Sequence, residues 1–355
     1  MQIIINKSSL EQILINSQNF IDKKDASQIT SHILLHADEM GLLSKATDFE
    51  TGISIQTTNL EIIQQGEATA NGKRLLDIVK ILKDEEITLE TDEDFLHIRQ
   101  NRSKFKLPMF KADQYPEFPI IENKNQFKIE PIAFLQAIKK VSPAIDTNNP
   151  KYELNGTLID IGTNNINFVA TDTRRLAIAS LEQNSEDNKA IIIPKKAISE
   201  IQKLFFDEME IFYDENIFLI KSSNFTFFTK LINGKYPDYQ RIIPKEHKYE
   251  LTLNRKDMIE KLKQITTISY EMKLTFSGDK ITFESLNEDN IEAKTELSTN
   301  LPIDEDIYLA INSRYILDFL ANIEKDEFKL SYNDSTLPFM LKSHNFITVV
   351  MPIMI

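Results

Sequence analysis

The sequence predicts an α+β fold of three tandem modules, each with two helices packed on antiparallel sheets. Two observations predict it. Internal similarity recurs at a period of about 120 residues, and each repeat contains helical periodicity followed by short alternating strands. The chain of 355 residues also exceeds the size of one ordinary hydrophobic core. We expect domains at residues 1–122, 123–245 and 246–355.

The first element of each repeat is a short apolar strand that runs into a helix. In the central repeat, Ile132, Leu135, Ile138 and Val141 recur at helical spacing, and Pro131 stands near the first turn, where proline is tolerated. The three segments are IIINKSSLEQILINSQNFI from Ile3, FKIEPIAFLQAIKKVSPAI from Phe127 and YELTLNRKDMIEKLKQITTI from Tyr249.

The second element is a helix followed by an acidic turn and two strands. It recurs from Gly72, Pro194 and Asn312, with strand-like alternation in Glu210–Tyr213 and Phe328–Ser331. The six helices are expected at Lys7–Phe20, Gly72–Leu82, Pro131–Val141, Pro194–Leu204, Arg255–Ile265 and Asn312–Asn322.

Two shorter echoes complete the repeat. KATDFETGISI matches VATDTRRLAIA and places Asp48 and Asp172 at equivalent points, and YPEFPII matches YPDYQRIIP at the module exits. The third module ends on TVVMPIMI, Thr348–Ile355, an uncharged apolar tail. Such a tail is predicted to be docked, because a frayed apolar terminus risks pairing with other chains. An ordinary last strand and the wall of a binding groove both fit this pattern.

Composition excludes several classes of protein. With no cysteine, the chain cannot be a disulfide scaffold, a zinc ribbon or a thiol enzyme. The start MQIIINKSSLEQ lacks a basic head before a long apolar stretch, and no apolar run reaches the roughly 18 residues of a membrane span. The sequence therefore predicts a soluble cytoplasmic protein.

Charge is distributed unevenly along the chain. The formal net charge is -13, yet the six helical segments hold 14 Lys or Arg against 6 Asp or Glu, and the remainder holds 27 against 48. Basic side chains on solvated helix faces explain this pattern, as does a helical surface that faces a polyanion. The net charge does not veto DNA binding, because acidic groups beyond a Debye length of about 8 Å are screened.

No catalytic constellation stands out. Gly72-Lys73-Arg74 and Gly234-Lys235 lack the rest of a phosphate-binding loop. His32 and His36 have no evident third ligand, so we expect no metal site and no cofactor. The acids at 92–94 and 304–306 have the pattern of solvated turns. A Mg²⁺-dependent nuclease or nucleotide-processing enzyme on repeated modules remains the alternative, and it would require acids that converge on the basic face.

Four motifs in this order resemble the bacterial DNA polymerase III beta subunit, the sliding clamp. They are YELNGTLIDI (Tyr152–Ile161), VATDTRRLAIAS (Val169–Ser180), LINGKYPDYQRIIPK (Leu231–Lys245) and the terminal VVMPIMI, and the resemblance spans the whole chain. It implies a non-catalytic processivity factor, a ring-shaped head-to-tail homodimer that encircles double-stranded DNA. The implied partners are a replicative polymerase subunit, clamp-loader subunits and repair polymerases that carry a short apolar peptide. A clamp paralogue with another role stays open.

The resemblance also implies residues for two interfaces. Sequence-independent DNA contacts require Lys and Arg that reach phosphates. The implied DNA-binding residues are Lys23, Lys24, Lys73, Arg74, Lys80, Lys139, Lys140, Lys151, Tyr152, Lys195, Lys196, Lys203, Arg255, Lys256 and Arg314. For the dimer, the resemblance places Lys104–Leu107 against the region of Ile268, with Phe105 and Leu107 as apolar anchors; an internal core strand is the other interpretation.

A peptide-binding groove is implied between modules two and three. It would comprise Leu154, Thr171, Thr173, Arg174, Arg175, Leu176, Pro237, Arg241, Ile242, Thr336, Pro338, Val349, Val350, Met351, Pro352 and Ile353. Flexible methionine suits a site that accepts several ligands. Arg174 and Met354 depart from the usual family pattern, so the polar contacts at the groove edge are the least defined part of this expectation.

Overall fold

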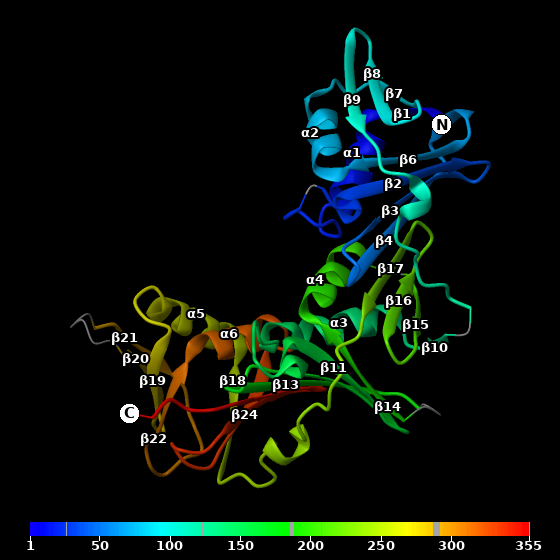
Figure 1. Ribbon diagram of the computed structural model, residues 1–355. Helices are drawn as coiled ribbons and strands as arrows, with labels where there is room; N and C mark the ends of the chain where they lie inside the picture. The colour runs from blue at the N-terminus through cyan, green and yellow to red at the C-terminus, as the bar shows by residue number, and fades with distance from the viewer. Residues whose placement is uncertain (26, 123, 185–187, 207, 287–291, 355) are drawn as a thin grey trace. The chain divides into compact units, whose positions relative to one another are not determined.

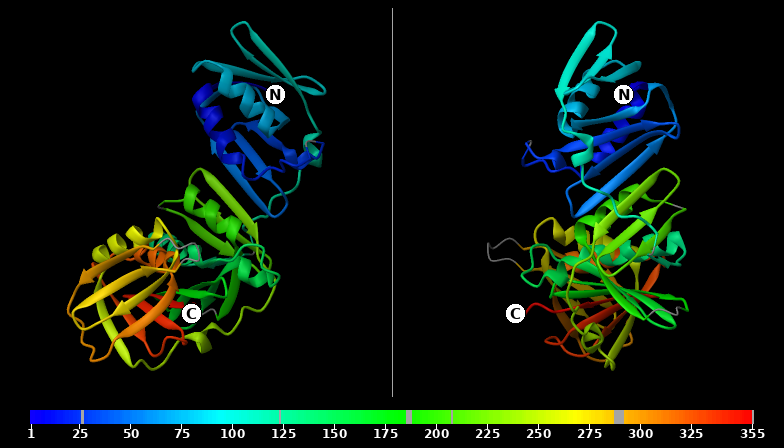
Figure 2. Two further views of the ribbon diagram at one scale, coloured as in Figure 1. Left: turned by 90° about the vertical axis from the view of Figure 1, so that its left-hand side faces the viewer. Right: turned by 45° about the vertical axis from the view of Figure 1, so that its right-hand side comes forward.

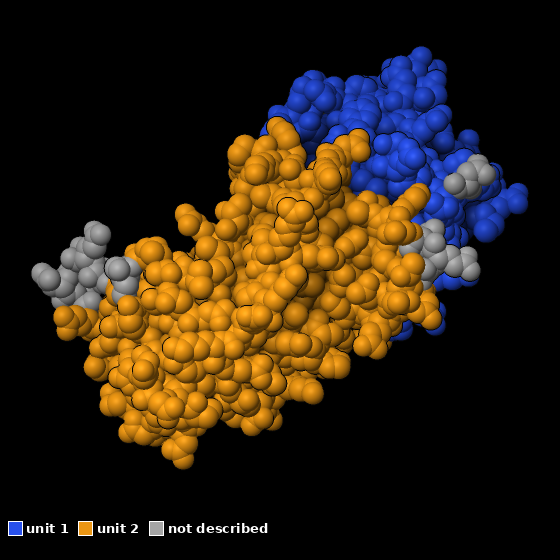
Figure 3. Space-filling view, turned by 90° about the horizontal axis from the view of Figure 1, so that it is seen from below, with its two compact units in different colours: residues 1–131, 207–231 blue, residues 132–206, 232–355 orange. Residues whose placement is uncertain are grey.

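The computed structural model describes residues 1–25, 27–122, 124–184, 188–206, 208–286 and 292–354. The chain divides into two compact units, which Figure 3 colours separately. Unit 1 contains residues 1–131 and 207–231, and unit 2 contains residues 132–206 and 232–355. Among the described residues, no helix has the length and apolar character needed to cross a bilayer.

Unit 1 contains two antiparallel sheets and a pair of helices that pack against each other (Figure 1 and Figure 2). One sheet has the strand order β5-β1-β7-β8-β9 and the other the order β10-β15-β16-β17-β4-β3-β2-β6. The elements are β1 (Gln2–Asn6), α1 (Lys7–Ser17), η1 (Ile29–Ser31), β2 (His32–Asp38), β3 (Gly41–Thr47), β4 (Thr51–Thr57), β5 (Leu60–Gln64), β6 (Gly66–Asn71), α2 (Gly72–Ile81), β7 (Glu86–Thr91), β8 (Phe95–Gln100), β9 (Ser103–Pro108), η2 (Ala112–Gln114), β10 (Asn125–Phe127), β15 (Glu210–Tyr213), β16 (Ile217–Lys221) and β17 (Phe225–Lys230).

Among its described residues, unit 2 contains an eight-stranded sheet, a four-stranded sheet and four α-helices. The strand orders are β14-β11-β12-β13-β25-β24-β23-β18 and β21-β20-β19-β22, all antiparallel. The elements are α3 (Pro131–Val141), η3 (Ser142–Ala144), η4 (Tyr152–Asn155), β11 (Gly156–Ile161), β12 (Asn165–Thr171), β13 (Arg175–Glu182), β14 (Lys189–Pro194), α4 (Lys195–Leu204), η5 (Tyr239–Ile242), β18 (Tyr249–Asn254), α5 (Arg255–Thr266), β19 (Glu271–Phe276), β20 (Lys280–Ser285), β21 (Lys294–Ser298), β22 (Ile307–Asn312), α6 (Ser313–Ala321), β23 (Glu327–Tyr332), β24 (Phe339–Ser343) and β25 (Phe346–Val350).

Three helices begin after an asparagine that caps the first turn. The side-chain oxygens of Asn71, Asn254 and Asn312 accept hydrogen bonds from backbone N–H groups of α2, α5 and α6, respectively. Such a cap satisfies a donor that has no partner inside the helix. In each case a Lys or Arg stands two residues after the asparagine, so the cap fixes where the helix and its basic side chains start.

Helix α1 ends at Ser17, three residues before the predicted end at Phe20. Ser17 donates its hydroxyl to the carbonyl of Ile13 at 2.8 Å, and the chain then turns inward. Phe20 is fully buried and packs edge-on against Phe227, with ring centroids 5.9 Å apart. The apolar residue that extended the predicted helix therefore belongs to the core beyond it.

The apolar C-terminal tail is docked as predicted. Strand β25 lies between β13 and β24 in the middle of the eight-stranded sheet, and Val349 and Val350 are buried. Residues Met351–Met354 follow the strand, and Ile355 lies outside the described residues.

The tandem α+β architecture is confirmed, with two α-helices in the described part of each of the three repeats. The predicted boundaries between domains stay predictions, and residue 123 lies outside the described residues. The sheets run across these boundaries, because β17 pairs with β4 and β25 pairs with β13. This pairing places β10 and β15–β17 of the predicted central domain in unit 1.

Candidate functional site

A tight loop between β12 and β13 forms the first part of the predicted groove. The hydroxyl of Thr171 donates to the carbonyl of Arg175 at 2.6 Å and accepts from the amide of Thr173 at 3.1 Å. Asp172 Oδ1 accepts from the amides of Arg174 and Arg175 at 3.1 and 3.0 Å. Thr173 has a φ of 71°, and Asp and Thr side chains that bond nearby backbone amides stabilise such turns. In this loop, the side chains of Thr173 and Arg174 are exposed to solvent.

The C-terminal tail forms the second part. Leu176 pairs with Val349, and Arg175 pairs with Val350. Beyond the strand, the Met351 amide donates to the Arg174 carbonyl at 2.9 Å, and the Ile353 amide donates to the Ala310 carbonyl of β22 at 2.7 Å. The tail is thus bonded to the β12–β13 loop through the Met351 amide and to β22 through the Ile353 amide.

An apolar cluster lies below the loop and the tail. Leu154, Leu176 and Val349 are each about 2 % exposed and belong to one cluster with Leu158, Val169, Tyr236 and Met340. Ile242 is 43 % exposed and precedes Ile243, which packs against this cluster, and Met351 is 40 % exposed and follows Val349 by two residues. Large exposed apolar side chains beside a buried apolar floor are the composition expected of a peptide-binding surface.

The other predicted groove residues lie in three segments. Pro237 and Arg241 belong to the segment before and within η5, Thr336 and Pro338 to the β23–β24 turn, and Pro352 and Ile353 to the tail. Arg241 and Thr336 are exposed, and the remaining four are half-buried.

Arg175 does not have the open position expected of a peptide contact. It is 8 % exposed, and its guanidinium bonds to Asp172, Asp318 and the carbonyl of Pro143. Its partners belong to the groove loop, to α6 and to η3. The predicted groove residue therefore connects parts of unit 2 that are far apart in sequence.

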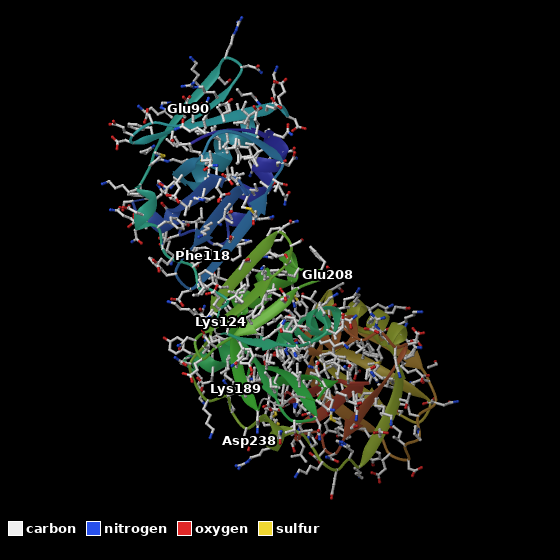
Figure 4. The ribbon with its side chains drawn as sticks, turned by 90° about the vertical axis from the view of Figure 1, so that its right-hand side faces the viewer. Glu90, Phe118, Lys124, Lys189, Glu208 and Asp238 are labelled. Carbon is white, nitrogen blue, oxygen red and sulfur yellow. The ribbon has the colours of Figure 1, made fainter. Side chains whose placement is uncertain are left out.

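A pocket of about 450 Å³ adjoins the predicted groove and shares Pro237 with it. The hydroxyl of Tyr239 donates to Asp160 at 2.7 Å, and burial together with that carboxylate raises the pKa of Tyr239 to about 12. Sequence reasoning did not name Asp160 or Tyr239 as site residues, although they lie in two motifs that it singled out, YELNGTLIDI and YPDYQRIIP. The pocket is lined by Leu158, Asp160, Ala190, Ile192, Gly234, Lys235, Tyr236, Pro237, Asp238, Tyr239 and Gln240, and Figure 4 labels Asp238.

In unit 1, the structure gathers three predicted DNA-binding residues. Lys23, Lys73 and Arg74 line one hollow of about 370 Å³, together with Asp22 and Asp77. Lys23 follows α1, whereas Lys73 and Arg74 belong to the first turn of α2, where the Asn71 cap fixes the backbone. Positive side chains and a helix N-terminus at one hollow favour a phosphate group.

Most of the other predicted DNA-binding residues are also exposed. Those exposed in the structure are Lys24, Lys80, Lys139, Lys151, Tyr152, Lys196, Lys203, Lys256 and Arg314.

Three of the predicted DNA-binding residues are half-buried and bond within the protein. The Lys195 Nζ donates to the Ile145 carbonyl at 2.8 Å and to Thr147 at 2.7 Å. Arg255 Nε donates to the Leu320 carbonyl at 2.7 Å, and Lys140 Nζ donates to Asn345 at 3.2 Å. Each of these bonds must be given up or shared before the same donor reaches a phosphate.

Strand β9, predicted to meet a partner subunit, is an edge strand of its sheet. Leu107 is 6 % exposed and pairs with Leu96 of β8, so it is already part of the core of unit 1. Phe105 is half-buried, and Ile268, between α5 and β19, is 43 % exposed. Phe105 and Ile268 are therefore the anchors still available for a partner.

The expected turn acids at 92–94 and 304–306 are exposed. His36 contacts Asp38 at 3.2 Å and Glu67 at 2.9 Å, whereas His32 is buried. Within the described ranges, no group of three or more His, Cys, Asp or Glu side chains is arranged to hold a metal ion.

Three sequence-family profiles match the chain in order. They describe the N-terminal domain of the DNA polymerase III beta subunit at residues 1–119, its central domain at 128–238 and its C-terminal domain at 240–354. Among curated proteins, the beta sliding clamp of Helicobacter pylori strain J99 is 38 % identical over 351 residues, which cover 96 % of this chain and 94 % of that protein. The beta sliding clamp of Staphylococcus epidermidis strain RP62A is 27 % identical over 339 residues, 91 % of this chain and 90 % of the relative.

Among solved structures, the Helicobacter pylori beta clamp bound to a DNA ligase peptide superposes with a TM-score of 0.95 at 38 % identity, with all of both chains covered. The Bacillus subtilis sliding clamp has a TM-score of 0.93 at 21 % identity, covering 100 % of this chain and 99 % of that one, a likeness of fold alone.

Proposed function

This chain belongs to the family of DNA polymerase III beta subunits, the beta sliding clamps, and from that premise we propose how its surfaces serve as a clamp. It is a non-catalytic processivity factor that tethers partner proteins to DNA. The observation that carries this function is the match of all three clamp domains, in order, along one chain. The nuclease alternative has no support among these matches.

We propose that two chains associate head to tail around double-stranded DNA in the cytoplasm. A head-to-tail contact is heterologous, and it closes only if the copies complete the turn. Phe105 on the free edge of β9 and Ile268 would supply its apolar contacts. Once the ring is closed, enclosure holds a tethered polymerase near the template, so each rebinding event occurs at a high effective concentration.

Retention on circular DNA tests enclosure. The purified protein, loaded by a bacterial clamp loader onto nicked circular DNA, should stay bound and should leave once the circle is cut. Two 41.0 kDa chains per particle are expected by light scattering. Equal loss from cut and uncut circles, or turnover of labelled DNA with Mg²⁺, would contradict the proposal.

We also propose that the groove of unit 2 binds short apolar peptides of replication and repair proteins. Support comes from the exposed Ile242 and Met351 beside a buried apolar floor, and from the related clamp that binds a DNA ligase peptide. We expect an aliphatic peptide anchor to bind with micromolar affinity, which corresponds to about 8 kcal/mol and permits exchange of partners.

The variant Met351→Ala tests the groove without removing the tail, because the Met351 amide keeps its bond to Arg174. With a fluorescein-labelled copy of the Helicobacter DNA ligase peptide as probe, we expect about 10-fold weaker binding through lost apolar contact. Met40→Ala is the matched control, since Met40 is 68 % exposed in unit 1. Equal affinities for both variants would refute the assignment of Met351 to the groove.

A further inference from the structure

We propose that Asp318 and Tyr315 of helix α6 are positioning residues of the peptide groove, acting through Arg175. This inference rests on the proposed peptide-binding function of unit 2. Neither side chain belongs to the predicted groove, and both lie on a helix that follows Arg175 by more than 130 residues in the sequence.

Arg175 is held from four directions. Its Nε donates to Asp172 Oδ2 at 3.1 Å, one terminal nitrogen donates to Asp318 Oδ2 at 2.6 Å, and the other donates to the Pro143 carbonyl. The Tyr315 ring lies under the guanidinium, 4.5 Å from its carbon to the ring centroid. Planar contacts of this kind use the rigid fork and the flat face of arginine, which lysine does not offer.

Two carboxylates, those of Asp172 and Asp318, contact Arg175 in the described part of the chain. Only Asp318 lies outside the loop. Asp172 lies on the loop and moves with it, so its bond to Arg175 does not fix the loop against the rest of unit 2. Asp318 is 33 % exposed, and Arg175 is 7 % exposed, as side chains. Loss of Asp318 removes one of the two carboxylates that balance the buried charge of Arg175, so Arg175 would then shift toward solvent.

A shift of Arg175 reaches the groove through the main chain. Arg175 pairs with Val350, and the preceding carbonyl, that of Arg174, accepts from the Met351 amide. Met351 is the exposed methionine of the proposed groove. Asp318 and Tyr315 therefore fix the separation between the loop and the tail, which sets the width available to a peptide anchor.

Asp318→Asn removes the charge and keeps the size of the side chain. We expect the probe peptide to bind about 5- to 30-fold more weakly, in the range of coupled side chains. Hydrogen exchange of the Met351 amide should become at least about 10-fold faster, since its bond to Arg174 opens more often. Asp318→Glu should restore most of the peptide affinity and most of the slow exchange of the Met351 amide, because it returns the anionic acceptor.

The matched control is Asp326→Asn, which removes an equal charge from an exposed ion pair with Lys256. It should leave affinity and exchange unchanged. Unchanged affinity and exchange in Asp318→Asn would overturn the inference. So would faster exchange throughout unit 2, which is the signature of a purely structural loss. If the wild-type chain does not bind the probe, the proposed peptide-binding function fails first, and this inference falls with it.

Discussion

His32 shows how a single buried side chain ties stability to pH. It is 4 % exposed, its Nδ1 has no hydrogen-bond partner within the described residues, and its ring packs on Phe110 at 4.5 Å between centroids. Burial, with the positive charge of Arg74, lowers the pKa of His32 from 6.5 to about 4. The imidazole is therefore neutral at pH 7, because the folded protein disfavours its charged form.

This lowered pKa predicts a loss of stability in acid. The unfolded chain takes up a proton near pH 6.5, whereas the folded chain does so only near pH 4. Stabilisation from His32 is complete above pH 6.5 and is lost progressively as the pH falls from 6.5 to about 4. Between pH 7.5 and 4.5 we expect wild type to lose about 2 to 3 kcal/mol more unfolding free energy than His32→Phe. Urea unfolding followed by circular dichroism measures this difference, and parallel losses would count against it.

Several basic residues show what the sequence could not reveal at this scale. The partners of Arg175, Lys195 and Arg255 lie 143, 50 and 65 residues away along the chain. Charge counts identified the basic helices but not which side chains turn inward, because that depends on carbonyls and carboxylates supplied by distant segments. The exposed residues Lys73 and Arg74 follow more directly, since they stand in the first turn of a helix with a local cap.

At the scale of elements, the strand pair β4–β17, here called the first junction, resembles the strand pair β13–β25, the second junction. Asp48 and Asp172 both accept backbone amides of their loops, and Phe49 and Thr173 both have a φ of 71°. The junctions differ in the next strand pair. Gly52 faces Phe228 where Leu176 faces Val349. At the first junction, the Phe228 ring therefore has no side chain opposite it, whereas two aliphatic side chains face each other at the second.

The first junction is filled by its own aromatic residues. Phe228 is 6 % exposed and packs edge-on against Phe118 at 5.0 Å between centroids, and Figure 4 labels Phe118. Lys45 lies over the same Phe118 ring at 5.3 Å. The repeated motif therefore places two facing aliphatic side chains at the second junction and a buried aromatic ring at the first.

Gly52 should accordingly tolerate no side chain. A Cβ at this position would lie 2.2 Å from Phe228 Cε1, so one of the two must move. We expect Gly52→Ala to destabilise the protein by about 1 to 3 kcal/mol through overpacking. Adding Phe228→Leu makes room and should recover part of that loss. Thermal unfolding of both single variants and the double variant gives the coupling, and strictly additive effects would contradict this packing.

Elements were predictable where their signals are local. The periodicity at Pro131–Val141 gave α3 its observed bounds, and the alternation at Glu210–Tyr213 gave β15. The pairing of β17 with β4 was not predictable from these patterns, because a strand's own alternation does not specify its neighbour. The docked tail was predictable as a strand, whereas its hydrogen bonds to Arg174 and Ala310 were not.

For the whole molecule, two ways of holding DNA have different dependence on salt. Phosphate contacts release counterions, so the affinity they give falls steeply as salt rises. Enclosure by a closed ring involves no such release. A sliding clamp needs weak, exchangeable contacts together with strong retention, and a ring provides the retention without base-specific bonds that would slow sliding.

Neutralising the basic hollow of unit 1 separates these two contributions. Replacing Lys23, Lys73 and Arg74 with Gln should reduce the salt slope of equilibrium DNA binding by about 2 to 3, since each phosphate contact contributes roughly 0.9. A control with the same charge change replaces Lys280, Lys294 and Lys329, which form exposed ion pairs with glutamates on sheets. Its slope should not change, because distant exposed charges are screened within about 8 Å. Once loaded on a nicked circle, both variants should remain as long as wild type and leave when the circle is cut. Rapid loss of the hollow variant from uncut circles would mean that adhesion, not enclosure, retains this protein on DNA.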